Sequence, residues 1–267
     1  TQEVVYVNSE LTKALADELY RAYCNHAAID TLISQRYPEL TADEAYLVQR
    51  YNAQRAAQLG HQVVGYKIGL TAKELMASME VDEPDYGRLY SGMELAENGI
   101  APFERMFEPK VEGEIAFVLG ADLPRQASAE DVLAATGYVQ AAFEFPETRL
   151  AGWRNRIADT VSDNSSAGHF MRSSAQRASD GMDFAAEELT LYKNGAVLAR
   201  GRADVILGNP LNSVAWLSNK LYDQYGRGLK AGDIVLSGAL CGAHPASPGD
   251  RFEAEFSTLG RLSVTFA

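Results

Sequence analysis

The 267-residue sequence predicts an α+β fold in which a helical N-terminal region lies on a β-rich body. Apolar residues recur at helical spacing over the first part of the chain, up to Gly60. From His61 onward, short β-branched or alternating runs are separated by turn residues, as is typical of strands. Hydrophobic residues make up 46% of the chain and charged residues 22%, which is enough apolar material for a sizeable core. We therefore expect a helical region over residues 1–60 and a β-rich domain over residues 61–267.

Two helices are predicted in the N-terminal region. The first extends from Ser9 to Tyr23, with its apolar residues in one stripe. The second begins at Thr41, because Thr41 and Glu44 match a capping box, and it ends at Gly60. No cluster of reactive side chains occurs in either helix. We therefore interpret this region as a docking or oligomerisation layer.

The β-rich domain is predicted from turn signals and apolar patterning. Strands are expected at residues 61–69, 87–93, 111–120, 137–145 and 232–240, with two more between 251 and 267. A hairpin is expected over 189–200, because Asn194-Gly195 is a strong signal for a tight turn. Short helices are expected at 72–79, 128–135 and 212–225, the second led by Ser128 and Asp131 and the last ended by Gly226.

Charge and cysteine content exclude several classes of protein. The chain has 24 basic and 36 acidic residues, a net charge of −12, which argues against nucleic-acid binding. No apolar run has the length of a membrane span, and the first residues lack the pattern of a signal peptide. Cys24 and Cys241 are far apart and form no CxxC pair, so a disulfide framework is excluded. We expect a cytoplasmic protein without a membrane or nucleic-acid partner.

The most informative local pattern is the E-x-E of Glu112 and Glu114. Alternate residues of a strand project to the same side, so these two carboxylates share a face and repel each other unless a cation or proton intervenes. Glu144 lies between aromatic residues in another predicted strand, an unusual place for an unpaired charge. Three converging carboxylates would suit Mg²⁺ or Mn²⁺. Ordinary surface glutamates explain the spacing equally well.

Two further charged residues lie next to glycines. Lys67 is in the run Gly65–Thr71, where partial burial would lower its pKa and suit it to proton transfer or to stabilising an anion. A surface lysine is the alternative interpretation. Asp85 lies in a predicted Pro-Asp-Tyr-Gly turn, where it is either a turn-capping residue or a catalytic acid.

Two loops contain mostly small and polar residues. The segment 159–168 is dense in short hydrogen-bonding side chains, as in a loop that holds a polar ligand, although a plain turn cluster has the same composition. The segment 236–242 contains Ser237 and Gly238, which would let a ligand approach the backbone closely. Cys241 is interpreted as a packing residue rather than a nucleophile. The four histidines form no metal-binding pattern, which argues against zinc.

Taken together, these segments resemble the hydratase and decarboxylase branch of the fumarylacetoacetate hydrolase superfamily. The resemblance rests on KIGLT, the PDYG turn, the E-x-E strand, the later Glu, DTVSDN, and SGAL followed by GDRFEA, in this order over nearly the whole chain. It implies a mixed β-roll or sandwich core with an N-terminal helical region, and homo-oligomers. It also implies Mg²⁺ or Mn²⁺ held by Glu112, Glu114 and Glu144.

The resemblance further implies a metal-dependent hydratase of aromatic meta-cleavage catabolism. Such an enzyme adds water to a 2-hydroxy-2,4-dienoate, the tautomer of a 2-oxo-4-enoate, and gives a 4-hydroxy-2-oxo acid. Lys67 would support the developing oxyanion or shuttle a proton, and Asp85 would serve as general acid and base. Contacts with the substrate are expected from Leu70, Asn164, Ser165, Ser237 and Gly238.

Several alternatives stay open at this point. The same metal ligands would serve a 4-oxalocrotonate-type decarboxylase of 2-oxo-3-enedioates, or a hydratase of 2-oxohept-4-ene-1,7-dioate. A C–C hydrolase is disfavoured, because no water-activating His–Glu pair can be placed beside the metal site. A non-catalytic partner of a related pathway enzyme would tend to lose metal ligands. The stretches 145–149 and 241–245 depart from the family pattern, which leaves the substrate open.

Overall fold

The computed structural model describes residues 9–153 and 155–267; residues 1–8, which contain part of the segment inspected for a signal peptide, lie outside the described range. The helices within it are α1 (Ser9–Asn25), α2 (Ile33–Arg36), α3 (Ala42–Gln58), α4 (Lys73–Ser78), α5 (Ala129–Ala135), α6 (Ile157–Ser162) and α7 (Pro210–Tyr225). The strands are β1 (Val63–Gly69), β2 (Asp85–Tyr90), β3 (Glu94–Leu95), β4 (Ile100–Ala101), β5 (Lys110–Leu119), β6 (Thr136–Phe145), β7 (His169–Arg172), β8 (Glu188–Lys193), β9 (Ala196–Arg202), β10 (Ile234–Ala239), β11 (His244–Pro245), β12 (Arg251–Phe256) and β13 (Gly260–Phe266).

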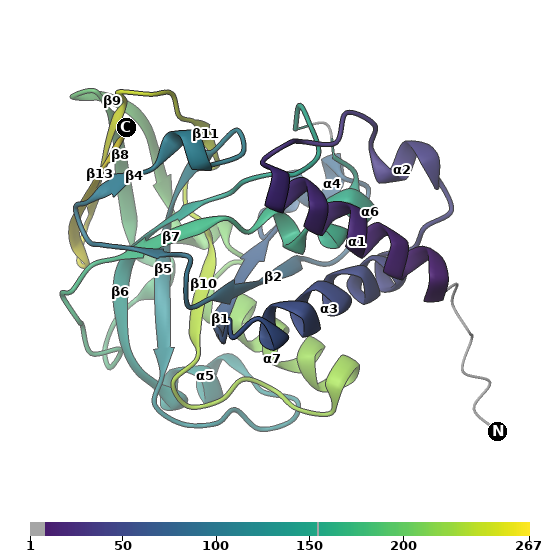
Figure 1. Ribbon diagram of the computed structural model, residues 1–267. Helices are drawn as coiled ribbons and strands as arrows, with labels where there is room; N and C mark the ends of the chain where they lie inside the picture. The colour runs from purple at the N-terminus through teal and green to yellow at the C-terminus, as the bar shows by residue number, and fades with distance from the viewer. Residues whose placement is uncertain (1–8, 154) are drawn as a thin grey trace.

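These strands form two mixed sheets. The larger has the order β2-β1-β10-β5-β6-β7-β3, with β11 paired to β5, and the smaller has the order β4-β13-β12-β8-β9. In the larger sheet β1 is parallel to β10, whereas the β10–β5–β6–β7 pairs are antiparallel. Figure 1 shows the strands gathered on one side of the molecule and helices α1, α2 and α3 on the other. The predicted α+β class with an N-terminal helical region is therefore confirmed.

The main core joins the two sheets and continues under α7. Phe145 and Phe252 pack edge-on against Phe266, with ring centroids 5.8 and 5.9 Å away. Leu217 and Leu221 of α7 belong to the same buried cluster. Burial of such large apolar side chains is the main source of stability, so this cluster fixes how the larger sheet lies on the smaller one.

The N-terminal helices have a smaller core of their own. Leu15, Ile33 and Val48 form a buried cluster with Leu150 from the β-rich part. Thr41 and Glu44 form the predicted capping box at the start of α3. The division of the chain at residue 60 stays a prediction.

The turn and helix ends that the sequence predicts from a few adjacent residues are present in the structure. Asn194 and Gly195 have φ angles of 53° and 81° and connect β8 to β9, as the hairpin prediction requires. Ser128 and Asp131 form a second capping box at α5. Gly226 has a φ of 70° at the end of α7.

Other elements differ from the prediction. β2 covers Asp85–Tyr90 rather than 87–93, and α7 begins at Pro210 because Asn209 caps it. The segment 159–168 is not a continuous loop, because its first residues belong to α6, where Asp159 accepts hydrogen bonds from the N–H groups of Ser34 and Arg156. The short elements α2, β3, β4, β7 and β11 were not predicted. In the described part of the chain, no helix has the length and apolar character needed to cross a membrane.

Candidate active site

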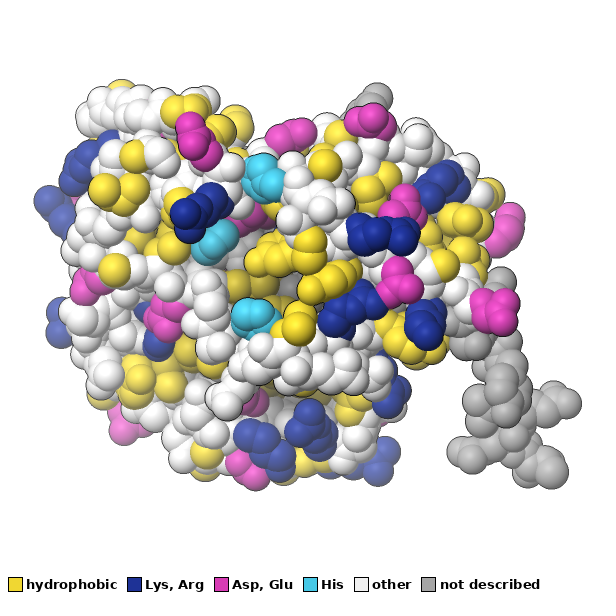
Figure 2. Space-filling view, in the orientation of Figure 1, with side chains coloured by type: hydrophobic (Ala, Val, Ile, Leu, Met, Phe, Trp, Pro, Cys, Tyr) yellow, Lys and Arg dark blue, Asp and Glu magenta, His cyan; other side chains and the backbone are white. Residues whose placement is uncertain are grey.

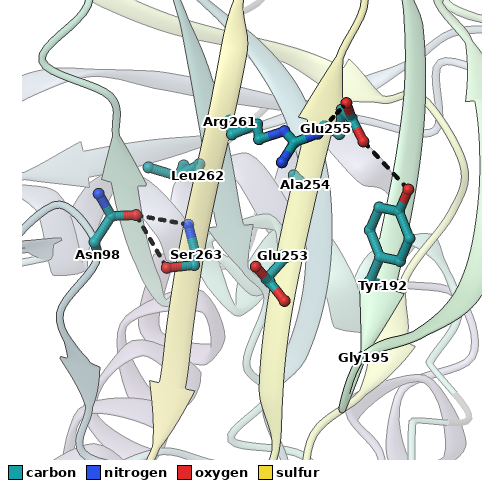
Figure 3. Close-up of a pocket in the computed structure, with 9 residues that line it drawn as sticks. All are labelled: Asn98, Tyr192, Gly195, Glu253, Ala254, Glu255, Arg261, Leu262 and Ser263. Carbon is teal, nitrogen blue, oxygen red and sulfur yellow. Dashed lines mark hydrogen bonds and ion pairs between the residues drawn. The ribbon is translucent and has the colours of Figure 1, made fainter.

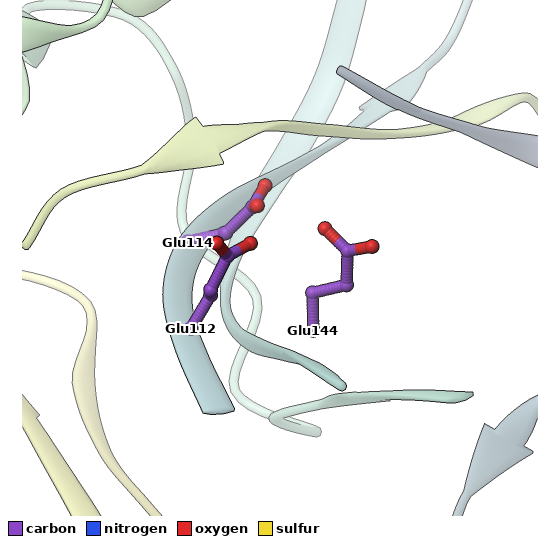
Figure 4. Close-up of side chains that lie close together, drawn as sticks. All are labelled: Glu112, Glu114 and Glu144. Atoms are coloured by element: carbon purple, nitrogen blue, oxygen red, sulfur yellow. The ribbon is translucent and has the colours of Figure 1, made fainter. Parts of the chain in front are cut away.

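Three carboxylates come together where β5 and β6 pair. The register places Glu112 directly opposite Glu144, and Glu114 lies two residues further along β5 on the same face. Figure 4 shows the side chain of Glu144 facing those of Glu112 and Glu114. Each offers one oxygen atom, and these atoms lie within 4.8 Å of one another. The structure thus brings together the three glutamates that the sequence singled out.

Most of the buried oxygens in this cluster lack partners. Glu114 and Glu144 are 0% exposed, and Glu112 is half-buried. Glu114 Oε2 accepts a hydrogen bond of 2.8 Å from the Gly238 N–H. Glu114 Oε1 and Glu144 Oε2 have no partner among the described residues, and Glu144 Oε1 has only the charged Lys67 Nζ, 3.2 Å away. Buried carboxylate oxygens are costly unless a cation neutralises them, so this donor set fits a hard divalent cation.

Electrostatics lead to the same conclusion. Burial raises the pKa of all three glutamates. Repulsion from Glu144 and Glu112 raises the pKa of Glu114 further, well above its usual range. The pKa of Glu144 rises to about 7, mainly through burial, although Lys67 opposes the rise. The cluster therefore resists full ionisation near neutral pH unless a cation is bound.

Lys67 is the positive charge beside the cluster. It lies on β1, and its Nζ is 3.2 Å from Glu144 Oε1. It is 5% exposed, so the alternative interpretation as a surface lysine is wrong. Burial alone would lower the pKa of Lys67, but Glu144, Glu112 and Asp85 outweigh burial and raise the pKa above its ordinary value. The expected lowering of the pKa is therefore wrong, and Lys67 provides a fixed positive charge in this arrangement.

Asp85 lies close to Lys67. It is the first residue of β2, opposite Gly69 on β1, and not part of a turn as predicted. A Cβ at Gly69 would lie 2.3 Å from Asp85 Oδ1 and 3.5 Å from Lys67 Nζ, so this glycine leaves room for both groups. Asp85 is 1% exposed, and neither of its oxygens has a hydrogen-bond partner in the described structure. Burial raises the pKa of Asp85 while Lys67 opposes the rise, which suits a carboxyl group that gives and takes a proton.

Three of the expected substrate contacts lie at the ends of β1 and β10. Leu70 directly follows β1 and has a φ of 55°. Ser237 and Gly238 lie where the register between β10 and β5 shifts. A Cβ at Gly238 would lie 2.4 Å from Thr71 Oγ1, so the two strand ends are in contact. The buried Ser237 hydroxyl has no partner among the described residues, which leaves it free to bind a ligand.

The other two lie in an unusual turn after α6. Asn164, Ser165 and Ser166 have φ angles of 57°, 55° and 54°, a left-handed conformation that costs about 1–2 kcal/mol per residue. The Asn164 side chain exchanges two 2.9 Å hydrogen bonds with the backbone of Arg88. Its amide therefore fixes the turn to β2. The buried Ser165 hydroxyl lies close enough to Asp85 to oppose the rise in the pKa of that carboxyl, which places this turn beside the candidate acid–base group.

A buried ion pair and a Glu–His contact beside this turn were missed. Arg149 Nε is 2.5 Å from Asp163 Oδ1, and the guanidinium also donates to the carbonyls of Asp163 and Ala167. Glu147 Oε1 is 2.6 Å from His169 Nδ1. Two signals for these contacts were present in the sequence: many polar residues in segment 159–168, and Glu147 in the stretch 145–149 that departs from the family pattern. Neither signal shows which residue pairs with which.

Cys241 and a surface depression elsewhere do not extend the site. Burial, with a contribution from Glu112, raises the pKa of the Cys241 thiol to about 12, which supports its interpretation as a packing residue.

Figure 3 shows the surface depression, which lies on the smaller sheet. There Glu255 accepts hydrogen bonds of 2.6 Å from Arg261 and 3.2 Å from the Tyr192 hydroxyl. Because these polar groups satisfy one another, they offer no set of ligand atoms like that of the glutamates.

Comparison with known proteins adds independent support. Residues 93–267 match the family model described as fumarylacetoacetate (FAA) hydrolase C-terminal. The chain is 37% identical over 252 residues to a 2-keto-4-pentenoate hydratase of Paraburkholderia xenovorans strain LB400, covering 94% of this chain and 93% of that protein. It is 35% identical over 237 residues to a 2-hydroxyhexa-2,4-dienoate hydratase of Comamonas testosteroni, covering 88% and 89%.

The solved structures give a similar result. The 4-oxalocrotonate decarboxylase of Pseudomonas putida G7, complexed with magnesium and adipate, matches with a TM-score of 0.93 and 30% identity over 98% of this chain and 99% of that one. A fumarylpyruvate hydrolase of Pseudomonas aeruginosa, 15% identical with a TM-score of 0.60 over 76% of this chain and 88% of that one, shares the fold. The expected β-roll architecture is therefore confirmed.

Proposed function

The chain belongs to the fumarylacetoacetate hydrolase family, and from this we propose that it is a metal-dependent hydratase of 2-hydroxy-2,4-dienoates in aromatic meta-cleavage catabolism. It adds water to the 2-oxo-4-enoate system and gives a 4-hydroxy-2-oxo acid. The observation that carries this proposal is the cluster of three carboxylates with unpartnered buried oxygens beside Lys67 and Asp85.

Glu112, Glu114 and Glu144 would hold Mg²⁺ or Mn²⁺. When bound, the cation would supply Lewis-acid stabilisation for the negative charge that develops on the substrate's oxygens. Gly238 supports this arrangement, because its N–H fixes one oxygen of Glu114 and leaves the other free. Lys67 adds a second positive charge for an anionic substrate, which approaches a chain of net charge −12.

Asp85 would carry the proton transfers. In the first step the 2-hydroxyl loses its proton to solvent and Asp85 delivers one to the far end of the diene, which gives a conjugated 2-oxo-enoate. In the second step Asp85, now ionised, takes a proton from water as the water oxygen attacks C4, and C3 takes up a proton from solvent, which restores the starting proton count. The raised pKa of Asp85 suits the first step, and the adjacent Lys67 stabilises the ionised form needed in the second.

A decarboxylase is the second candidate. The likeness to the Pseudomonas putida decarboxylase, with its TM-score of 0.93, favours it, because the same ligands could stabilise the dienolate left when CO₂ departs. A hydratase of the longer 2-oxohept-4-ene-1,7-dioate remains a further candidate. Near full-length identity of 35–37% with several dienoate hydratases supports the first proposal more strongly.

Three expectations about the cellular setting remain proposals. We propose that the enzyme works in the cytoplasm, that it forms a homo-oligomer, and that it associates with a related enzyme of its pathway. The two cysteines are free, which agrees with a reducing compartment.

The test is product identification. Purified protein with Mg²⁺ is incubated with 2-hydroxypenta-2,4-dienoate and, separately, with a 2-hydroxymuconate-type diacid. We expect water to be added to the monoacid and no CO₂ to be released from the diacid. Release of CO₂ would overturn the assignment in favour of the decarboxylase. Glu114→Gln should lose both Mn²⁺ binding and turnover, whereas Glu94→Gln, on the short strand β3, should keep both.

A further inference from the structure

A second cavity lies away from the three glutamates. Its volume is about 270 Å³, and α1, α3, the end of β2 and the segments 147–149 and 162–169 line it. Figure 2 shows a hollow in this region, between the helices and β7, edged by hydrophobic and histidine side chains. None of Lys67, Asp85 and the three glutamates lines it. The cavity therefore lies outside the cluster of proposed metal ligands and acid–base groups, and it shares only Asn164 with the expected substrate contacts.

The charged groups in the buried wall of this cavity are already paired. Glu147 Oε1 is 2.6 Å from His169 Nδ1, and Asp163 forms its ion pair with Arg149. Glu147 also accepts a 3.0 Å hydrogen bond from the Phe107 N–H. An anionic or cationic ligand would find no unpaired opposite charge in this wall. The wall therefore favours an uncharged ligand.

One buried hydroxyl group nevertheless lacks a partner there. The Ser162 side chain is 1% exposed, and its Oγ has no hydrogen-bond partner among the described residues. His169 Nδ1 is held 2.6 Å from Glu147 Oε1, so Nε2 is the ring nitrogen left to contact a ligand. Both residues line the cavity. A buried polar atom without a partner is costly, so the Ser162 hydroxyl points to a ligand that carries a hydroxyl group.

The opposite wall is apolar and aromatic. Tyr20, Tyr23 and Leu59 come from the N-terminal region, and Tyr90 and Met93 come from the end of β2 and the turn after it. Tyr23 and Leu59 are 63% and 57% exposed, unusually high for such side chains. Aromatic rings and a methionine sulfur favour contact with a planar ring. The volume is somewhat below the roughly 300–1,000 Å³ of pockets that bind drug-sized ligands, which limits the ligand to about one ring.

We propose that this cavity binds an uncharged, planar molecule of one ring that carries a hydroxyl group, such as a simple phenol. The ring lies against the tyrosines and Met93, and the hydroxyl bonds to Ser162 or His169. This inference does not depend on the proposed hydratase activity. It gives the N-terminal helices a part in ligand binding, in addition to the docking role inferred from the sequence.

Calorimetric titration of the full chain with phenol tests the proposal. We expect one phenol to bind per chain with the same affinity in excess EDTA and in Mg²⁺, and benzoate to bind at least tenfold more weakly. Ser162→Ala and His169→Gln should each weaken phenol binding about two- to tenfold, the usual range for one hydrogen bond. Ala56→Phe, which fills the α3 side of the cavity, should abolish it.

Matched controls lie outside the cavity. Ser179→Ala removes a buried hydroxyl whose nearest partner is the Thr136 carbonyl at 3.5 Å, and His26→Gln removes a ring that packs on Phe107. Both should bind phenol as the parent chain does. Circular dichroism melting shows which variants are folded. If Ser162→Ala or His169→Gln does not fold, Ala56→Phe still tests whether phenol binds in this cavity. Absence of phenol binding, equal affinities in all folded variants, or displacement of phenol by 2-hydroxypenta-2,4-dienoate would overturn the proposal.

Discussion

Buried ionisable residues of this protein fall into two groups. Asp163 and Glu147 have partners for their charges and hold segments of the chain together. Asp85, Glu114 and Glu144 are equally buried, yet most of their oxygens lack hydrogen bonds to described residues, and among the three only Glu144 forms an ion pair there, with Lys67. A protein retains such unsatisfied carboxyl groups chiefly where a ligand or a reaction uses them. The distinction between satisfied and unsatisfied burial therefore separates structural acids from candidate catalytic ones.

Asp85→Asn tests this distinction directly. The amide cannot give and take a proton, so kcat for the dienoate should fall by about 10²–10⁴-fold, the usual contribution of a general acid–base group. Mn²⁺ binding should persist, since Asp85 is not among the three grouped carboxylates. Steady-state kinetics and Mn²⁺ titration measure the two properties. Asp82→Asn, an exposed neighbour, is the control. An unchanged kcat in Asp85→Asn would show that the proton moves elsewhere.

Single elements were predicted well where the signal is local. The capping residues of α3 and α5 and the Asn194-Gly195 turn act through hydrogen bonds or φ angles of a few adjacent residues, so their sequence is sufficient. The left-handed turn at Asn164 was not predictable in the same way. Its conformation depends on Arg88, far away in the chain, whose backbone the Asn164 amide binds.

Gly195→Ala is the test at this scale. Gly195 has a φ of 81°, and a Cβ there would meet no atom within 4 Å, so the change acts through the backbone alone. We expect a loss of about 1–2 kcal/mol in the free energy of unfolding, the usual cost of a left-handed L-residue. Urea titration measures this loss. Turnover should not change, because the hairpin belongs to the smaller sheet; Ala196→Ser is the control. Lost activity in a folded variant would mean that the hairpin supports the site.

The whole molecule brings together residues whose meeting the sequence left undetermined. Spacing indicated that Glu112 and Glu114 share a face, but only the pairing of β5 with β6 brings Glu144 opposite them. Lys67 lies beside them because β1 pairs with β10 and β10 pairs with β5. The carboxylates around Lys67 raise its pKa, whereas the sequence predicted a lowered pKa. Sheet register and long-range electrostatics are properties of the assembled fold, which explains why the residues were predictable and their environment was not.

Stability of the whole protein should depend jointly on metal and pH. Burial raises the pKa of Glu144 to about 7, above its value in the unfolded chain. The folded state thus holds this proton more tightly, so without metal this group's contribution to stability falls as pH rises from about 4.5 to 7. Mn²⁺ needs the ionised form, so the stabilisation it gives should increase from pH 6 to pH 8.

Thermal melting at several pH values measures this dependence. At a concentration 100 times its Kd, Mn²⁺ should add about 2.7 kcal/mol, or roughly 5–10 °C in Tm, at pH 8. The increase should shrink at pH 6 and disappear in excess EDTA. Glu144→Gln should show no increase at either pH. A Tm increase that is equal at pH 6 and pH 8 would contradict the link to carboxylate ionisation.

The parallel pairing of β1 with β10 also has a consequence for biosynthesis. Strand β1 leaves the ribosome well before its neighbour β10, so one edge of β1 stays unpaired until the long segment between them has been made. Contacts between such distant segments form slowly, and exposed strand edges invite aggregation in the meantime. We therefore expect the nascent chain to be prone to aggregation until β10 has been made. Lys67 meets the strand that carries Gly238 only after the long segment between them has been made.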